Sequence, residues 1–370
     1  MKVLHFFKTY YPDSYGGIEN LIFQLASNGD KQGIQSEVLS LSSNGGARNE
    51  RIENHLAHRS KLDFYLASTG FSYSVFNDFR ELADNADIIH YHFPWPFMDV
   101  VHFFNRIKKP TVVTYHSDIV KQKYLYYLYK PLMYLFLKSV DRVVATSSNY
   151  LKTSCVLKNI KKKVDVIPLG INDHAAAPAP TLLKLKWQQT IPSPFFLFIG
   201  SFRYYKGLHI LLESMKGVDL PVVLVGIGKL EKELKRQAHR LDLRNIYFLG
   251  ALSDEDKCAL LELCLGVVFP SHLRSEAFGI TLVEGAMYGK PLISSEIGTG
   301  TTYINIDNET GLVVPPSNST ALKAAMLTLW NNPQLATHLG TNARARYEQF
   351  FTVDKMVRGY AELYKSVLAQ

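Results

Sequence analysis

The chain has 370 residues, more than one hydrophobic core usually organises, and this length favours two domains. It is 47% hydrophobic and 20% charged, which is the composition of a soluble globular protein. The net charge of +8 favours an anionic partner, but the phosphates of a small ligand, acidic lipids and nucleic acid all satisfy that condition.

The cysteines and the apolar segments exclude two classes of protein. The three cysteines form no C-x-x-C pair, and such an odd, sparse set excludes a disulfide framework and fits a reducing cytosol. The apolar stretch within residues 1–8 is too short for a signal-peptide core. The most apolar long segment, Tyr124 to Leu137, is broken at Lys130-Pro131 and is shorter than the roughly 20 residues of a spanning helix. We therefore expect a cytoplasmic protein that does not cross a membrane.

In chain order, the first half alternates short runs of Val, Ile and Phe with longer amphipathic stretches, which is typical of βαβ units around a buried parallel sheet. Strands are predicted at Val3–Phe7, Ser36–Leu41, Ile88–Tyr91, Thr111–Tyr115, Arg142–Ala145 and Val164–Ile167. Proline and small residues interrupt this pattern between Gly170 and Pro194, which indicates a domain boundary.

The second half repeats the alternation. Strands are predicted at Phe195–Ile199, Val222–Val225, Ile246–Phe248, Gly266–Phe269 and Leu292–Ser294, and the chain beyond Thr320 is predicted to be helical. We therefore predict an N-terminal Rossmann-like domain at residues 1–172, a linker at 173–194, a second Rossmann-like domain at 195–350, and a C-terminal helix at 351–370 that packs back toward the first domain. Such α/β sheets bind ligands outside the carboxyl ends of their strands, so two facing domains would share a central cleft.

Two glutamates with seven residues between them, Glu276 and Glu284, follow the strand predicted at Gly266–Phe269. Gly279 lies where a loop would turn into a helix that starts at Ile280. Backbone N–H groups at that helix start could hold a diphosphate, and Glu284 could accept hydrogen bonds from ribose hydroxyls. An acid that caps the helix and a second acid on its surface would give the same spacing.

Two cations follow the first strand of the second half, in the segment from Gly200 to Gly207. Arg203 offers a bidentate fork to phosphate, and Lys206 offers a point charge. Either residue alone is typical of a solvated surface. Together, beside a strand-to-helix turn and after a glycine that lets the backbone approach a ligand, they indicate a diphosphate clamp.

With both motifs present, the chain resembles family 4 of the glycosyltransferases, whose hallmarks are a G-x-x-R-x-x-K-G loop and an E-x7-E segment. The resemblance covers essentially the whole chain, because Gly16-Gly17-Ile18-Glu19 follows the first strand and Thr114-Tyr115-His116-Ser117-Asp118 follows the start of a later one. It implies an α/β fold of the GT-B type. It also implies a retaining, metal-independent transfer of a sugar from a nucleoside diphosphate, with no cofactor beyond that donor.

The resemblance implies a role for each matching residue. Arg203 and Lys206 would neutralise the leaving diphosphate, Glu276 would reach the hydroxyls of the transferred sugar, and His116 would contact that sugar from the other domain; these four are the candidate catalytic residues. The candidate donor-binding residues are Gly16, Gly17, Gly200, Leu252, Phe278, Gly279, Ile280, Thr281 and Glu284. The candidate acceptor-binding residues are Glu19 and Asp118.

The implied reaction has a loose transition state, with positive charge at the anomeric carbon and negative charge on the diphosphate. Stabilising the departing oxygens therefore accelerates the reaction most. The leaving phosphate itself can take the proton of the acceptor. Within family 4 the chain looks most like bacterial transferases that build surface polysaccharides such as O antigen. This favours GDP-mannose as the donor and a polyprenol-linked or oligosaccharide acceptor; a UDP-sugar donor, or a sugar-nucleotide epimerase of the same fold, is the alternative.

Two patterns imitate metal sites. His90 and His92 point to one face of a strand, but we find no third ligand nearby in the sequence and expect polar residues at the cleft end of that strand. Asp254-Glu255-Asp256 imitates the D-x-D of metal-dependent transferases, yet it follows Ser253 at an expected helix start, where acids are favoured. We therefore predict no metal.

The sequence also offers features of two other functional classes. A dehydrogenase is disfavoured because Gly226-Ile227-Gly228 has Glu231, and Gly298-Thr299-Gly300 has Tyr303, at the third glycine position of the dinucleotide fingerprint. The lysines and tyrosines of residues 121–130 could stack bases or lie on an anionic lipid surface, and they also suit a helix half-buried on a sheet. We expect no nucleic acid partner, and we expect this region to meet a lipid-linked acceptor at the inner face of the plasma membrane.

Overall fold

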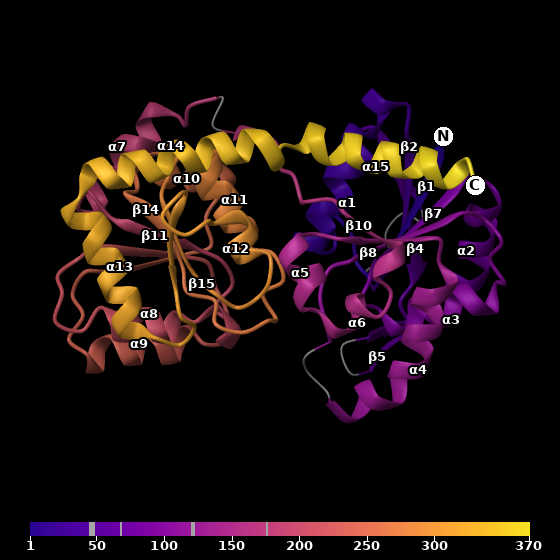
Figure 1. Cartoon of the computed structure of the whole chain (residues 1–370), viewed down its shortest axis with the longest axis horizontal. Helices are drawn as coiled ribbons and strands as arrows, with labels where there is room; N and C mark the ends of the chain where they lie inside the picture. Colours follow the sequence, from indigo (N-terminus) through magenta and orange to yellow (C-terminus); the bar gives the residue numbers. More distant parts are fainter. Residues whose placement is uncertain (44–48, 67–68, 120–122, 175–176) are drawn as a thin grey trace. The chain divides into compact units, whose positions relative to one another are not determined.

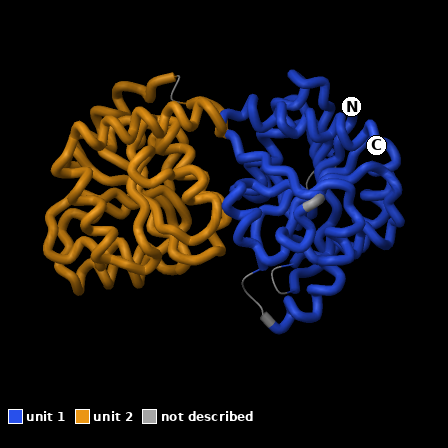
Figure 2. Tube along the Cα trace, viewed as in Figure 1, with its two compact units in different colours: residues 1–170, 352–370 blue, residues 171–351 orange. Residues whose placement is uncertain are grey.

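The structure is a computed structural model that describes residues 1–43, 49–66, 69–119, 123–174 and 177–370 (Figure 1). The chain forms two compact units (Figure 2). Unit 1 comprises residues 1–170 and 352–370, and unit 2 comprises residues 171–351. Each unit has its own sheet and its own core, so each is described by itself.

Unit 1 is built on an eight-stranded sheet with the order β10-β9-β8-β7-β1-β2-β4-β3. All neighbours run parallel except β3 and β4. The strands are β1 (Lys2–Phe6), β2 (Gln35–Ser42), β3 (Asn49–Ile52), β4 (His55–Lys61), β7 (Ile88–Phe93), β8 (Thr111–Tyr115), β9 (Arg142–Ala145) and β10 (Val164–Val166), and a separate hairpin pairs β5 (Phe64–Leu66) with β6 (Thr69–Phe71). The central strands are buried along their whole length, as expected of a parallel sheet covered on both faces.

The helices of unit 1 include one from the far end of the chain. They are α1 (Gly17–Asn28), α2 (Val75–Asp84), α3 (Pro96–Phe104), α4 (Lys123–Ser139), α5 (Ser148–Thr153), α6 (Cys155–Lys158) and α15 (Val353–Leu368). In α15, the hydroxyl of Tyr360 is 2.7 Å from Thr114 Oγ1 and that of Tyr364 is 2.6 Å from His90 Nδ1. These contacts tie the last helix to the centre of the sheet.

Unit 2 has a six-stranded parallel sheet with the order β13-β12-β11-β14-β15-β16. Its strands are β11 (Phe196–Ile199), β12 (Val222–Val225), β13 (Ile246–Gly250), β14 (Gly266–Phe269), β15 (Leu292–Ser295) and β16 (Gly311–Val314). Its helices are α7 (Thr181–Thr190), α8 (Leu208–Ser214), α9 (Glu231–Arg240), α10 (Asp254–Leu263), α11 (Ile280–Met287), α12 (Thr301–Ile304), α13 (Ser319–Asn331) and α14 (Pro333–Phe350). Phe and Leu side chains from β11, β12 and α8 form its core together with α13.

The structure differs from the sequence prediction in two segments. Residues 173–194, expected to be a linker, contain α7, because Trp187 is buried and its ring N–H donates to Asp256 at 3.0 Å. Helix α4 continues through Pro131, which does not end it. In the part of the chain that the structure describes, no helix is both long and apolar enough to cross a membrane.

Candidate active site

The predicted donor-site residues of unit 2 follow the carboxyl ends of parallel strands, and two loops bring their charged members together. The loop after β11 carries Gly200, Arg203 and Lys206, and the loop after β14 carries Glu276. Because β11 and β14 are hydrogen-bonded neighbours, their carboxyl ends open at the same edge of the sheet. This edge is where ligands bind in open α/β sheets.

Backbone geometry explains the glycines of the β11 loop. A short 3₁₀ turn, Tyr204–Lys206, ends at Gly207, which has φ +72°. A Cβ at Gly207 would lie 2.0 Å from the carbonyl oxygen of Pro270 in the next loop, so only glycine fits this close approach. Gly200 also has a positive φ, +153°. The loop is therefore packed tightly against the start of the β14 loop.

Lys206 and Glu276 form the central charged contact of the site. Lys206 Nζ donates to Glu276 Oε2 at 2.6 Å, and the Ser271 hydroxyl donates to the same oxygen at 3.3 Å. The Lys206 ammonium also lies 4.6 Å from the ring centroid of Phe269. Both partners are largely buried, with side-chain exposures of 12% and 11%. The cation is thus held in a defined position before any ligand arrives.

Arg203 lies three residues earlier and behaves differently. Its side chain is exposed, and within the described residues its guanidinium makes neither an ion pair nor a hydrogen bond. A free guanidinium beside a fixed ammonium can contact a diphosphate with two parallel hydrogen bonds. The pair therefore combines one fixed and one adaptable cation.

Helix α11 begins as the sequence predicts. Its N-cap is Gly279, in the left-handed region at φ +102°, and the Thr281 hydroxyl donates to the carbonyl oxygen of Ile199 at 3.0 Å. This bond fixes the start of α11 against the carboxyl end of β11. Glu284 lies in the second turn, and burial raises the pKa of its carboxyl group, against the opposing charge of Lys257. No described residue hydrogen-bonds to its carboxylate.

The remaining predicted donor residues of unit 2 follow the carboxyl ends of β13 and β14. Ile280 is the first residue of α11, and Leu252 lies, half-buried, between β13 and α10. Phe278 is buried against Gly300, where an added Cβ would come within 2.6 Å of its ring. The backbone N–H of Gly300 donates to the Ala277 carbonyl at 2.9 Å. These contacts fix the backbone just before the α11 N-terminus.

In unit 1, Gly16 and Gly17 start α1 after the loop that follows β1. Gly16 is the N-cap of α1, and a Cβ there would lie 2.4 Å from Glu19 Oε2. The other carboxylate oxygen of Glu19 accepts from Thr9 at 2.9 Å and Ser14 at 2.7 Å. Glu19, assigned to the acceptor by resemblance, therefore binds its own loop in this structure.

His116 and Asp118 lie at the carboxyl end of β8. His116 is 7% exposed, and burial lowers its pKa to about 3, so its ring is neutral at physiological pH. Asp118 Oδ1 accepts from the hydroxyls of Tyr115 at 2.9 Å and Ser154 at 2.7 Å, and the Asp118 backbone N–H donates to Tyr150 at 2.6 Å. Asp118 is thus a fixed part of the loop that presents His116.

Sequence reasoning missed the histidine cluster behind His116. We expected no third ligand near His90 and His92, and this was wrong: His5, on the neighbouring strand β1, joins them, and one nitrogen from each ring lies within 4.8 Å of those of the other two. His92 further contacts His116, Nδ1 to Nε2, at 3.1 Å. Burial lowers the pKa of all four rings. A metal requires unprotonated nitrogens, which these rings offer.

In the second metal-like pattern, Asp254-Glu255-Asp256, the described contacts lie within unit 2. Ser253 caps α10 and accepts the Asp256 N–H at 3.1 Å, while Asp256 itself pairs with Lys186 at 3.3 Å and with Trp187. The acids at this helix start therefore stabilise α10 and fix α7.

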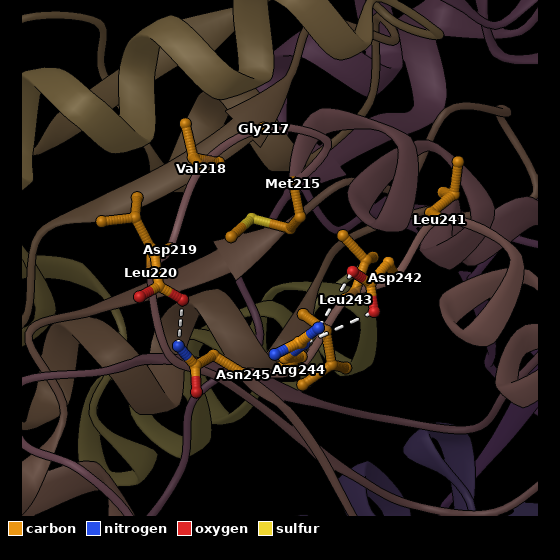
Figure 3. Close-up of a pocket in the computed structure, with 11 residues that line it drawn as sticks. Met215, Gly217, Val218, Asp219, Leu220, Leu241, Asp242, Leu243, Arg244 and Asn245 are labelled. Atoms are coloured by element: carbon orange, nitrogen blue, oxygen red, sulfur yellow. Dashed lines mark hydrogen bonds and ion pairs between the residues drawn. The ribbon is translucent and has the colours of Figure 1, made fainter.

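A surface hollow of unit 2 lies away from these loops (Figure 3). Its lining comes from the segments that precede β12 and β13, including Asp219, Asp242, Arg244 and Asn245. Arg244 pairs with Asp242 at 3.4 Å, and Asn245 donates to Asp219. These residues lie at the amino ends of the strands, the opposite edge from the candidate site.

Comparisons with known proteins agree with this arrangement. The family profile described as "Glycosyltransferase Family 4" matches residues 15–175, and the profile "Glycosyl transferases group 1" matches residues 184–346. The chain is 57% identical to D-rhamnosyltransferase WbpZ of Pseudomonas aeruginosa, covering 95% of this chain and 92% of that protein. It is 50% identical to O-antigen chain mannosyltransferase C of Escherichia coli, covering 100% and 99%.

Solved structures show the same fold. Sucrose-phosphate synthase from Thermosynechococcus elongatus superposes with a TM-score of 0.80 at 20% identity, covering 100% of this chain and 99% of that one. HepE from Anabaena, solved with UDP, gives 0.79 at 19% identity, covering 99% and 100%. The two Rossmann-like units are thus those of the GT-B fold, as expected. The chain belongs to glycosyltransferase family 4.

Proposed function

We propose that this glycosyltransferase moves mannose from GDP-mannose, with retention and without a metal, onto a polyprenol-linked or oligosaccharide acceptor during bacterial O-antigen synthesis. The identity to a relative named for O-antigen mannosyl transfer, over the full length of both chains, carries the proposal. The second relative is named for D-rhamnose, which is mannose without the 6-hydroxyl. The two named sugars therefore share the manno configuration, with an axial 2-hydroxyl.

In this proposal the charged loops of unit 2 bind the leaving group. The bond between the anomeric carbon and the β-phosphate oxygen breaks, and its electron pair leaves with the diphosphate. Arg203 and Lys206 neutralise that charge, while Glu276 positions Lys206 and accepts from a sugar hydroxyl. The acceptor oxygen bonds to the anomeric carbon on the same face, and its proton passes to the departing phosphate oxygen. Glu284 holds the ribose.

A product assay tests this function. The enzyme is incubated in EDTA with GDP-mannose and a lipid-linked oligosaccharide acceptor, and the new linkage is assigned by NMR. An α-mannosyl product supports the proposal, whereas a β-anomer excludes retention. A product that forms only with UDP-sugars would favour the UDP-dependent alternative. Conversion of the sugar nucleotide without any acceptor would favour the epimerase.

We further propose that unit 1 contacts an anionic membrane that carries the acceptor. Helix α4 exposes Tyr124, Tyr127 and Leu128, at 90%, 69% and 81%, and also carries the exposed Lys130. The β5–β6 hairpin is exposed as well, and Phe71 links it to Phe97 of α3, with ring centroids 4.9 Å apart. Helix α3 in turn packs on α4.

Vesicle flotation tests the membrane contact. Lys121 lies outside the described residues, so we place the substitutions on the exposed apolar side chains: Tyr127→Ser with Leu128→Ser should abolish flotation with vesicles that contain phosphatidylglycerol. Leu182→Ser is the matched control, because Leu182 is 80% exposed in unit 2. Unchanged flotation of the double variant, or equal loss in the control, would exclude α4 as the contact.

A further inference from the structure

The histidine cluster of unit 1 contains a continuous hydrogen-bonded chain that ends at His116. His5 Nδ1 is 3.2 Å from His92 Nε2, and His92 Nδ1 is 3.1 Å from His116 Nε2. In each bonded pair the rings are nearly parallel, at 26° and 21°. The three rings come from β1, β7 and the end of β8, which are consecutive in the sheet. His90 lies beside this chain but bonds elsewhere, to Thr114 and Tyr364.

These contacts favour a hydrogen-bonded chain over a metal site. A zinc ion is bound by histidine nitrogens through their free lone pairs. Both nitrogens of His90 are already hydrogen-bonded to hydroxyl groups. The nitrogens of His5 and His92 that face each other are likewise engaged in a hydrogen bond.

Neutral imidazoles in such a chain must all donate in one direction, because each ring carries a single proton. Burial lowers the pKa of His5 and His116 to about 3 and that of His92 well below its usual value, so all three are neutral at pH 7. If His92 donates to His116, then His5 must donate to His92. In the reverse direction, His116 donates to His92 and His92 donates to His5.

His5, at the end of the hydrogen-bonded histidines that is far from His116, determines the direction of N–H donation. His5 is 1% exposed, and its Nε2 has no hydrogen-bond partner among the described residues. In the direction from His116 to His5, that nitrogen would carry an N–H with no acceptor among the described residues, in a side chain that is almost fully buried. In the direction from His5 to His116, His5 Nε2 is unprotonated and only its lone pair is without a partner. Buried N–H groups without partners are the rarer and costlier case.

We propose that His92 is a positioning residue that holds His116 as the tautomer with its proton on Nδ1. His116 Nε2 then accepts from His92, and His116 Nδ1, which bonds to no described residue, donates to an oxygen of the ligand. Such support of one ring by another fixes both its orientation and its proton. The tautomer follows from the cluster alone; its effect on turnover rests on the proposed function of His116 at the donor sugar.

Nitrogen NMR of the full-length protein with ¹⁵N-labelled histidine tests the tautomer directly. We expect His116, assigned with His116→Asn, to show a protonated Nδ1 and an unprotonated Nε2. His92→Phe should abolish this pattern. His90→Phe is the matched control, because His90 is equally buried two residues away and breaks different bonds, so His116 should not change. If His92→Phe fails to fold, His5→Phe replaces it and should give a mixture of both tautomers.

A protonated Nε2 in the unaltered protein, or an unchanged His116 in a folded His92→Phe protein, would overturn the proposal. So would a stoichiometric transition metal that is lost in both the His90 and His92 variants. Turnover provides a separate readout: His92→Phe should lower kcat about 10- to 100-fold, and His90→Phe should not. If NMR gives the expected tautomer and kcat is unchanged, the hydrogen-bonded arrangement of the histidines is confirmed and the catalytic role of His116 is refuted.

Discussion

Replacing Lys206 by alanine separates the catalytic role of this cation from its structural role. In the proposed function, the substitution removes one of the two positive charges that neutralise the leaving diphosphate. Losing one preorganised group that stabilises developing negative charge lowers kcat by about 10²- to 10³-fold. The same change leaves Glu276 without the partner that donates to it at 2.6 Å. Both effects can be measured on one variant.

The structural cost can be worked from the burial of the pair. Removing one member of a buried ion pair costs about 3–5 kcal/mol. Because the two side chains are 12% and 11% exposed, we expect the lower end, about 3 kcal/mol. At about 2–4 °C per kcal/mol for a domain of this size, Tm should fall by roughly 6–12 °C. Adding Glu276→Gln removes the unpaired charge and should restore most of that loss.

The assay combines thermal melting with initial rates at saturating donor. We predict that Lys206→Ala/Glu276→Gln recovers Tm and does not recover kcat. A single variant with kcat within about threefold of the unaltered enzyme would refute the role of Lys206 in charge neutralisation. Recovery of kcat together with Tm in the double variant would show that Lys206 acts only through stability.

Three further predictions follow from single sites. Glu284→Gln should weaken GDP binding about 10- to 100-fold in calorimetry, because a hydrogen bond to a charged group is worth about 1.5–3 kcal/mol; unchanged affinity would remove Glu284 from the ribose site. Gly207→Ala should lower the free energy of unfolding in urea well beyond Gly217→Ala, since both have φ +72° but only Gly207 would place its Cβ 2.0 Å from Pro270; equal losses would contradict the close approach. Because the folded-state pKa of His5 is lowered to about 3, folding should lose stability as pH falls from 6.5 toward 3, by about 2 kcal/mol at pH 5 relative to His5→Phe, and parallel pH profiles of the two proteins would contradict this.

The strands at the centre of both sheets could be predicted from the sequence, because they are buried on both faces and appear as continuous apolar runs. Thr111–Tyr115 and Gly266–Phe269 match the prediction residue for residue. Strand β4, His-Leu-Ala-His-Arg-Ser-Lys, was missed because it lies near the sheet edge and only every second or third side chain is buried. The buried Trp187 likewise has no neighbouring apolar periodicity that would reveal α7.

The charged residues of the candidate site could also be found from the sequence, because Arg203, Lys206, Glu276 and Glu284 occur in two short motifs. Their pairing could not, since the contact of Lys206 with Glu276 depends on β11 lying beside β14. The link from His5 to His116 was out of reach for the same reason. Its members are far apart in the sequence and meet only through the order β8-β7-β1.

The proposal that this glycosyltransferase uses GDP-mannose is tested most directly by thermal melting in EDTA. The separate ligands are GDP, UDP, ADP, GDP-mannose, UDP-glucose and NAD. A ligand that binds only the folded protein raises Tm, by the equivalent of about 2.7 kcal/mol at a hundredfold excess over Kd. We predict a selective rise with GDP and GDP-mannose that is reduced in the Glu284→Gln protein. A rise with NAD alone, or no rise with any nucleoside diphosphate, would contradict it.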